Sequence, residues 1–184
     1  MDEVIVKGMP EALRYFIVSD CGIPVSAFHI IQGEDLPEPA NQLLNHPVDM
    51  TSTLEKYHGS KLYVDCLRRE ISRRVYLREV FLKAQKDDAI VEYGVIAIVL
   101  DSFSDDQQKV IQAAKIPFGG LLHDFKIEFK SAPVCYFSIS AEFLKDTPFR
   151  KLKGELFCGR FNQLSKISGE SIAWIMEILT PPFH

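Results

Sequence analysis

Over much of its length the chain alternates apolar and polar residues with period two, which is the pattern of half-buried β-strands. Seven segments have this alternation or the apolar, β-branched run of an interior strand: residues 61–71, 74–84, 89–100, two runs within 125–143 that break at Ala132-Pro133, 155–166 and 171–179. The last two flank Ser168-Gly169, which predicts a hairpin.

Helical spacing is confined to a few short stretches. Residues 10–21 place Leu13, Phe16 and Ile17 on one face, which predicts a short amphipathic helix. The proline-rich residues 36–39 that follow predict a connector, too short to separate two domains.

A second helix is predicted where Asp49 or Thr51 can cap its start. It would run to about Tyr57, and Gly59 would end it, since a glycine commonly follows the last helical turn.

A third helix is predicted from a capping box. Ser104 is followed three residues later by Gln107, so each side chain can bond the other's backbone N–H. We expect this helix to end near Lys115, because Pro117 stops it. Its buried residues should be Val110, Ile111 and Ala114.

Many strands, few helices and no regular alternation of the two predict an α+β fold around a mainly antiparallel sheet. The chain has 184 residues, of which 47% are hydrophobic and 25% charged, so it is neither disordered nor collagen-like. We expect one domain over residues 1–184, large enough to be stable without disulfides.

The charge balance argues against a nucleic-acid partner. There are 21 Lys and Arg against 25 Asp and Glu, a net charge of −4, whereas nucleic-acid binders need a clustered basic face. The densest basic run is Arg68, Arg69, Arg73 and Arg74. It is interpreted as a solvated strand face, with a phosphate-binding patch as the alternative.

A membrane or a metal partner is not expected either. The longest apolar stretch, residues 95–100, is far below the roughly 20 residues of a spanning helix, and no secretory signal is apparent. The four cysteines lie far apart without metal-ligand spacing, which predicts reduced thiols, a cytoplasmic protein and no metal site.

Arg78 interrupts an otherwise apolar strand face. It shares that face with Tyr76, Val80 and Leu82. If the face is in the core, the guanidinium needs an anion, because an unpaired buried charge is very costly. The alternative is a surface arginine whose stem packs against its neighbours.

Glu177 interrupts the apolar run of residues 172–179. If the last hairpin is symmetric about Ser168-Gly169, Arg160 lies directly across from Glu177. The pair is then either a cross-strand ion pair or part of a site with a buried carboxylate held for a substrate hydroxyl. A one-residue bulge would separate the two side chains.

Pro117-Phe118-Gly119-Gly120 is the third unusual feature. Two glycines allow uncommon backbone angles and close approach of a ligand, and free N–H groups in such a turn bind anions. A purely structural helix end is the alternative.

Taken in order, four blocks resemble the chorismate pyruvate-lyase family, the enzymes that make 4-hydroxybenzoate. They correspond to the family's S-M-T helix start, its W-L-R-E strand, its P-L-G turn and its T-E-L-F-L-P last strand after an S-G turn. In this sequence the blocks are residues 48–54 (VDMTSTL), 74–82 (RVYLREVFL), 116–122 (IPFGGLL) and the hairpin 160–182, which contains MEILTP.

The resemblance implies a chorismate lyase-like fold, with helices packed on one side of the sheet and an internal ligand cavity closed by flaps. It implies a cofactor-free lyase that eliminates pyruvate from chorismate to give 4-hydroxybenzoate. The expected partners are this substrate and product, and the composition permits a monomer or a small homo-oligomer.

The resemblance also implies roles for four residues. Arg78 matches the arginine that holds the ring carboxylate, and Glu177 the glutamate near the ring hydroxyl; these are the expected catalytic residues. Met50 and Phe118 match positions whose backbone meets the ligand. Two residues depart from the family pattern: Asp49 replaces a small polar residue and Phe118 replaces leucine, which affects the shape of the pocket.

Two other functions remain open. Effector domains of transcription regulators use the same fold class to bind small molecules without chemistry, although the first 45 residues show no helix-turn-helix pattern. A free-standing binding protein for an aromatic acid is the corresponding alternative. The third interpretation is a lyase or isomerase that acts on a chorismate relative and makes another hydroxybenzoate.

Overall fold

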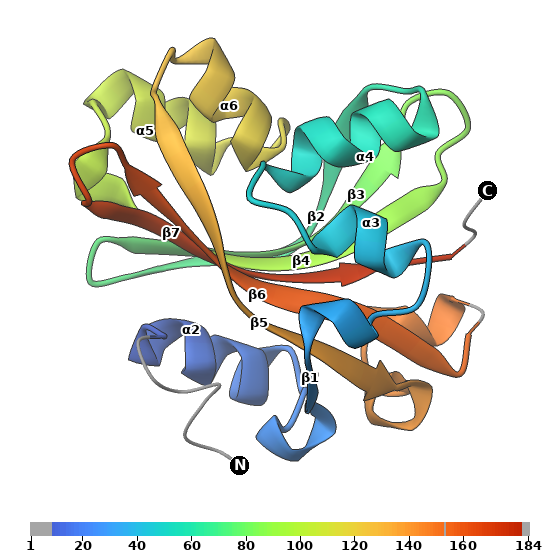
Figure 1. The fold of residues 1–184 in the computed structure, drawn as a ribbon. Coiled ribbons are helices and arrows are strands. Elements are labelled where there is room, and N and C mark those ends of the chain that lie inside the picture. The colour runs from blue at the N-terminus through green and yellow to red at the C-terminus, as the bar shows by residue number, and fades with distance from the viewer. Residues whose placement is uncertain (1–8, 153, 182–184) are drawn as a thin grey trace.

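The computed structural model describes residues 9–152 and 154–181; the last sequence block extends to Pro182, which lies outside them. Figure 1 shows one large twisted sheet with helices above and below it. The sheet has seven strands in the order β1-β5-β6-β7-β4-β3-β2, and every neighbouring pair is antiparallel. The strands are β1 His29–Ile31, β2 Leu62–Ser72, β3 Val75–Ala84, β4 Ile90–Val99, β5 Phe129–Ser140, β6 Leu156–Lys166 and β7 Ser171–Leu179. The predicted α+β class and antiparallel sheet are confirmed.

The helices are short. They are α2 Glu11–Tyr15, continued by a π-helical turn Phe16–Asp20, then α3 Ala40–Leu44, α4 Met50–His58, α5 Asp105–Gln112 and α6 Phe118–Asp124. Short 3₁₀ turns lie at Val25–Ala27, Gly33–Asp35, Leu100–Ser102, Ala141–Leu144 and Pro148–Lys151. In the described part of the chain, no helix is long and apolar enough to span a bilayer.

The expectation that the helices pack on one side of the sheet is wrong. The four helices α3 to α6 cover one face, while α2 lies against the opposite face (Figure 1). The reason lies in the interior strands. On β3, Leu77 and Phe81 point to the α2 side and Val80 and Leu82 to the other, so both faces are apolar and both need cover.

Local sequence patterns place most of the elements correctly. Asp49, rather than Thr51, caps α4 by accepting a hydrogen bond from the Ser52 N–H, and Gly59 ends the helix with φ of 58°. The capping box of Ser104 and Gln107 is present at the start of α5. The first helix buries the predicted Leu13, Phe16 and Ile17.

The region after α5 differs from the prediction. The helix ends at Gln112, not near Lys115, because Ala114 takes a left-handed conformation, and Val110 is exposed. Pro117 does not stop this helix but stands at the N-cap of α6. Phe118 and the two glycines after it are therefore helical residues, not a turn with unusual backbone angles.

The predicted break at Ala132-Pro133 is a bulge inside one long strand. Pairing of β5 with β6 shifts between Pro133 and Cys135 and then continues. A bulge accommodates a proline, which has no N–H for the strand ladder, without ending the strand.

Apolar side chains form three clusters. One lies between α2 and the sheet and contains Phe16, Phe81, Tyr93 and Phe137. The other two lie on the opposite face: one under α3 and α4, including Met50 and Leu54, and one under α5 and α6. Several buried polar residues of the interior strands, including Arg78, Arg160, Asn162 and Glu177, lie on this same face, where the four helices cover them.

At Gly159, β6 packs closely against the backbone of β7 and the side chain of Phe137. A Cβ there would lie against the backbone oxygen of Glu177 and 2.5 Å from the ring of Phe137. Because strand backbone cannot move aside, we expect Gly159→Ala to lower the free energy of unfolding by about 1–3 kcal/mol or more.

Gly120→Ala is the matched control for Gly159→Ala. The nearest atom to a Cβ at Gly120 is a methyl carbon of Ile116 at 3.5 Å, so this change should leave stability equal or raise it by up to about 1 kcal/mol. Urea unfolding of both variants makes the comparison, and equal stabilities would contradict the packing described for β6.

Candidate active site

A group of polar side chains lies on the helix-covered face of the sheet, across four adjacent strands. Strand register aligns Arg78, Ile96, Ile175 and Asn162 in one row, and Val80, Gly94, Glu177 and Arg160 in the next. Residues opposite one another in antiparallel strands point to the same face. Arg78, Arg160, Asn162 and Glu177 therefore share one surface, between the two apolar clusters under the helices.

A small pocket opens between this surface and the starts of α4 and α6. Its free volume is about 40 Å³. The four residues expected from the sequence, Met50, Arg78, Phe118 and Glu177, all line it. The structure thus brings together residues that are up to 127 positions apart in the chain (177 − 50).

Arg78 is buried, with 2% of its surface exposed, yet its guanidinium is poorly satisfied. Its Nη2 donates a long hydrogen bond of 3.5 Å to the Ile116 carbonyl. Its Nε and Nη1 have no partner among the residues that the structure describes. Burial lowers the pKa of Arg78, because a charge removed from water loses its hydration. The site thus holds a cation with free donors, and no ion pair joins it to a carboxylate of the described residues.

Arg160 is also fully buried, but its guanidinium is well satisfied. Its Nε lies 2.5 Å from Glu177 Oε2, and the two residues are direct cross-strand partners, so the predicted register is confirmed. Nη1 donates to the carbonyls of Leu44 and His46 at 2.8 and 3.0 Å, and Nη2 to that of Val48 at 3.4 Å. The ion pair therefore also ties the segment before α4 to the sheet.

Glu92 is a pocket residue that the sequence analysis did not single out. It stands on β4 two residues before Gly94, is 4% exposed, and its Oε2 has no partner among the described residues. Its Oε1 lies 3.3 Å from the place a Cβ of Gly94 would occupy, so the side chain reaches over that glycine. Burial raises the pKa of Glu92 well above its usual value; the charge of Glu177 raises it further, and Arg160 lowers it.

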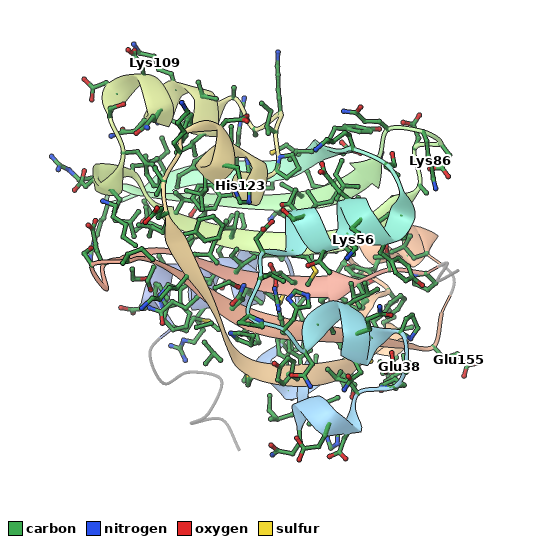
Figure 2. The ribbon with its side chains drawn as sticks, turned by 45° about the horizontal axis from the view of Figure 1, so that its top comes forward. Glu38, Lys56, Lys86, Lys109, His123 and Glu155 are labelled. Atoms are coloured by element: carbon green, nitrogen blue, oxygen red, sulfur yellow. The ribbon has the colours of Figure 1, made fainter. Side chains whose placement is uncertain are left out.

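Asp49 lines the edge of the pocket where the starts of α4 and α6 meet, a region called the seam below. Its Oδ1 accepts from the Ser52 N–H at 2.8 Å, and its Oδ2 lies 3.2 Å from Nε2 of His123, which Figure 2 shows on α6. Gly119 permits this close approach, because a Cβ there would lie 2.7 Å from Asp49 Oδ1. Outside the seam is an open hollow that Asp49 and His123 also line.

Asn162 stabilises the segment just before α4 through hydrogen bonds. Its Nδ2 donates to Ser131 Oγ at 3.0 Å, and that hydroxyl donates to the Val48 carbonyl at 3.2 Å. Glu92 was missed because it stands alone in the apolar strand β4, and Asn162 because it stands among other polar residues of β6. The feature that could have identified them is a polar residue on the sheet face that also carries Arg78 and Glu177.

Three arginines of the basic run on β2 and in the turn after it contact other groups of the protein. Arg68 donates to the Asp20 carbonyl, Arg69 to that of Gln112 at 2.8 Å, and Arg74 lies 2.9 Å from a carboxylate oxygen of Asp101. These contacts favour the structural interpretation over a phosphate-binding patch.

The sequence matches no model of a known protein family, and no curated protein matches it. The chemistry of the site therefore has to follow from its own geometry. One pocket contains Arg78, a guanidinium with unused donors of the kind that bind carboxylates, and the carboxyl groups of Glu177 and Glu92, which are in different environments.

Replacing each of the two buried arginines by methionine should change the free energy of unfolding in opposite directions. Arg160→Met leaves Glu177 as an unpaired buried carboxylate, and should lower the free energy of unfolding by about 3–5 kcal/mol. Arg78→Met removes a buried cation whose donors are unsatisfied, and should raise it by about 1–3 kcal/mol. Urea unfolding of both variants compares them. Destabilisation by Arg78→Met would show that its guanidinium has a partner.

Glu92 should make stability depend on pH. Below about pH 4.5 the Glu92 carboxyl is protonated in both the folded and the unfolded chain. Between that pH and the raised pKa of the folded protein, this carboxyl ionises only in the unfolded chain. Wild-type stability should therefore fall as pH rises through this window, by up to about 1.4 kcal/mol per pH unit from this residue.

Glu92→Gln should remove that contribution to the slope, so the variant gains stability over the wild type between pH 5 and 8. Urea unfolding at several pH values measures the difference, with Glu70→Gln at an exposed position of β2 as the control. Parallel curves for wild type and Glu92→Gln would mean that Glu92 is ionised in the folded protein.

Proposed function

We propose that this protein is a chorismate lyase, which eliminates pyruvate from chorismate and releases 4-hydroxybenzoate. The supporting observation is Arg78, a buried guanidinium whose Nε and Nη1 have no partner in the described chain, in one pocket with Glu177, Met50 and Phe118. These are the positions at which the sequence resembles that enzyme family.

Arg78 is suited to hold the ring carboxylate of chorismate. A guanidinium binds a carboxylate through two parallel charge-assisted hydrogen bonds, and the buried setting strengthens each of them. The N–H of Phe118 is in the first turn of α6, where backbone N–H groups have no helical acceptor, so it is a second donor for the same group.

Glu177 is suited to bind the ring hydroxyl at the other end of the ligand. One strand, β4, separates it from Arg78, and the two lie in adjacent rows of the sheet. Strand spacing and rise place their Cα atoms roughly 12 Å apart. Both side chains line one pocket, as groups that bind opposite ends of one six-membered ring would have to do.

The proposal requires the pocket to widen. A cavity of about 150 Å³ takes one benzene molecule, whereas this pocket has about 40 Å³. The seam between α4 and α6 is the place for such opening, because its polar contact is that of Asp49 with the half-exposed His123, and because it leads to the outer hollow. These two helix starts would act as flaps over an internal ligand cavity in a chorismate lyase-like fold.

The chemistry asks the protein mainly for orientation and charge stabilisation. The carbon–oxygen bond to the enolpyruvyl group breaks, the hydroxyl-bearing carbon loses its proton, and the ring becomes aromatic. Aromatisation supplies the driving force, so no metal or redox cofactor is needed for this step. Apolar neighbours such as Val80 and Ile96 exclude water from the reacting groups.

A second candidate is a non-catalytic binding protein for an aromatic acid. The free donors of Arg78 favour this function equally, since they account for carboxylate binding without turnover. A lyase or isomerase that makes a different hydroxybenzoate would use the same carboxylate contact.

Incubating the purified protein with chorismate tests the proposal. We expect release of pyruvate, measured with lactate dehydrogenase, together with equal amounts of 4-hydroxybenzoate identified by chromatography. Arg78→Met should lower kcat/KM about 100-fold or more while the fold is retained, because the ligand carboxylate loses its partner.

Arg69→Met is the matched control. Arg69 is the cross-strand partner of Arg78 but is exposed on β2, so the same substitution there should leave turnover unchanged. Binding of 4-hydroxybenzoate without pyruvate release would favour the binding protein. Pyruvate with a different aromatic product would favour the third function, and full activity of Arg78→Met would remove Arg78 from the site.

A further inference from the structure

Glu92 is a charged pocket residue to which the resemblance assigns no role. It is buried on β4, its carboxyl reaches over Gly94, and Oε2 has no hydrogen-bond partner among the described residues. A buried polar oxygen without a partner is costly and is retained mainly where a ligand can satisfy it.

Glu92 and Glu177 share the attraction of one guanidinium. Arg160 binds Glu177 through Nε and uses its other nitrogen atoms on the carbonyls of Leu44, His46 and Val48. Two buried carboxylates that share one cation do not both ionise readily, and the one without the direct contact keeps its proton. This assigns the proton to Glu92, in agreement with the raised pKa of that carboxyl.

Charged residues from several neighbouring elements lie around Glu92. Glu177 faces it from β7 and Arg160 from β6, and both influence its protonation. Arg78 on β3 and Asp49 at the start of α4 line the same pocket. His46, in the segment before α4, is near Arg160 and Glu177, and burial followed by the charge of Arg160 lowers its pKa. No cation is in direct contact with Glu92 in the described residues.

We propose that Glu92 is a catalytic acid that gives its proton to the ether oxygen of chorismate as the enolpyruvyl group leaves. This inference rests on the proposed lyase function. Glu92 and Glu177 lie on adjacent strands, one row apart, and both are on the same side of the row of Arg78. The ether and the hydroxyl of chorismate are likewise on neighbouring ring carbons, away from the ring carboxylate that Arg78 would hold.

The step balances without a co-reactant. The bond between the ring carbon and the ether oxygen breaks with its electron pair on oxygen, which takes the proton of Glu92 and leaves as the enol of pyruvate. The hydroxyl-bearing carbon gives its proton to the Glu177 carboxylate, and that electron pair completes the aromatic ring. After the products leave, the proton passes from Glu177 to Glu92, and the two carboxyl groups return to their starting states.

The pairing of an ionised and a protonated carboxyl is what acid–base catalysis requires. Environments that push two neighbouring carboxyl groups apart in proton affinity assign one as base and the other as acid. Here the difference comes from one ion pair: Arg160 contacts Glu177, and no ion pair joins it to Glu92 among the described residues.

Glu92→Gln tests the inference, because glutamine keeps the shape and a hydrogen-bond donor but has no proton to transfer. We expect kcat for pyruvate release to fall about 100-fold or more, while the Kd for 4-hydroxybenzoate, measured by calorimetry, changes less than threefold. Wild-type kcat should fall at high pH as Glu92 loses its proton, and this limb of the pH profile should be absent from the residual activity of the variant.

Glu79→Gln is the control. Glu79 is a buried carboxyl on the same sheet, but it points to the α2 side and accepts a hydrogen bond from Tyr93, so its variant should keep both kcat and the high-pH limb. Thermal unfolding of both variants confirms that they are folded before kinetics are compared.

The possible results separate the two proposals. If the wild type releases no pyruvate, the lyase function fails and the acid role fails with it. If the wild type is active and Glu92→Gln keeps its rate and pH profile, only the role of Glu92 is overturned. Loss of 4-hydroxybenzoate binding together with activity would make Glu92 a positioning residue and would also overturn the acid role.

Discussion

The contact between Arg160 and Glu177 is the interaction on which the site depends. A fully buried guanidinium is tolerated in a sheet interior only when its donors are satisfied, and this one bonds a carboxylate and three backbone carbonyls. Because those carbonyls belong to the segment before α4, the same residue holds Met50 and Asp49 over the pocket. Stability of the strand pair and placement of the helix start thus have one common cause.

The remaining charges of the pocket are not balanced in the same way. Arg78 and Glu92 are both buried, and each has polar atoms without a partner in the described chain. Such groups lower the stability of the fold, so an apolar pair would serve the core better. Arg78 and Glu92 lie on one face of the sheet, in the rows on either side of the satisfied pair, and this distribution of unsatisfied polar groups is the basis of the proposed ligand site.

Much of this arrangement could be predicted from local pattern. The alternation along β3 shows that Arg78 shares a face with Val80 and Leu82, and counting positions from Ser168-Gly169 places Arg160 opposite Glu177. Helix α6 could not be predicted in the same way, because Pro117 and the glycines after it resemble the end of a helix. In the structure Gly119 serves close packing against Asp49, a requirement set by a residue 70 positions earlier (119 − 49).

The sequence by itself determined β2, β3, β4, β6 and β7, the caps of α4 and α5 and the register of the last hairpin, because each depends on residues close together in the chain. It did not predict the short strand β1, and it divided β5 into two runs. Only the tertiary structure decided which helices cover which face, and that Glu92 lies beside Glu177. Those two glutamates are 85 positions apart (177 − 92) and meet because β4 pairs with β7 in the strand order of the sheet. Strand order is set by the summed packing of the whole chain, which no local pattern contains.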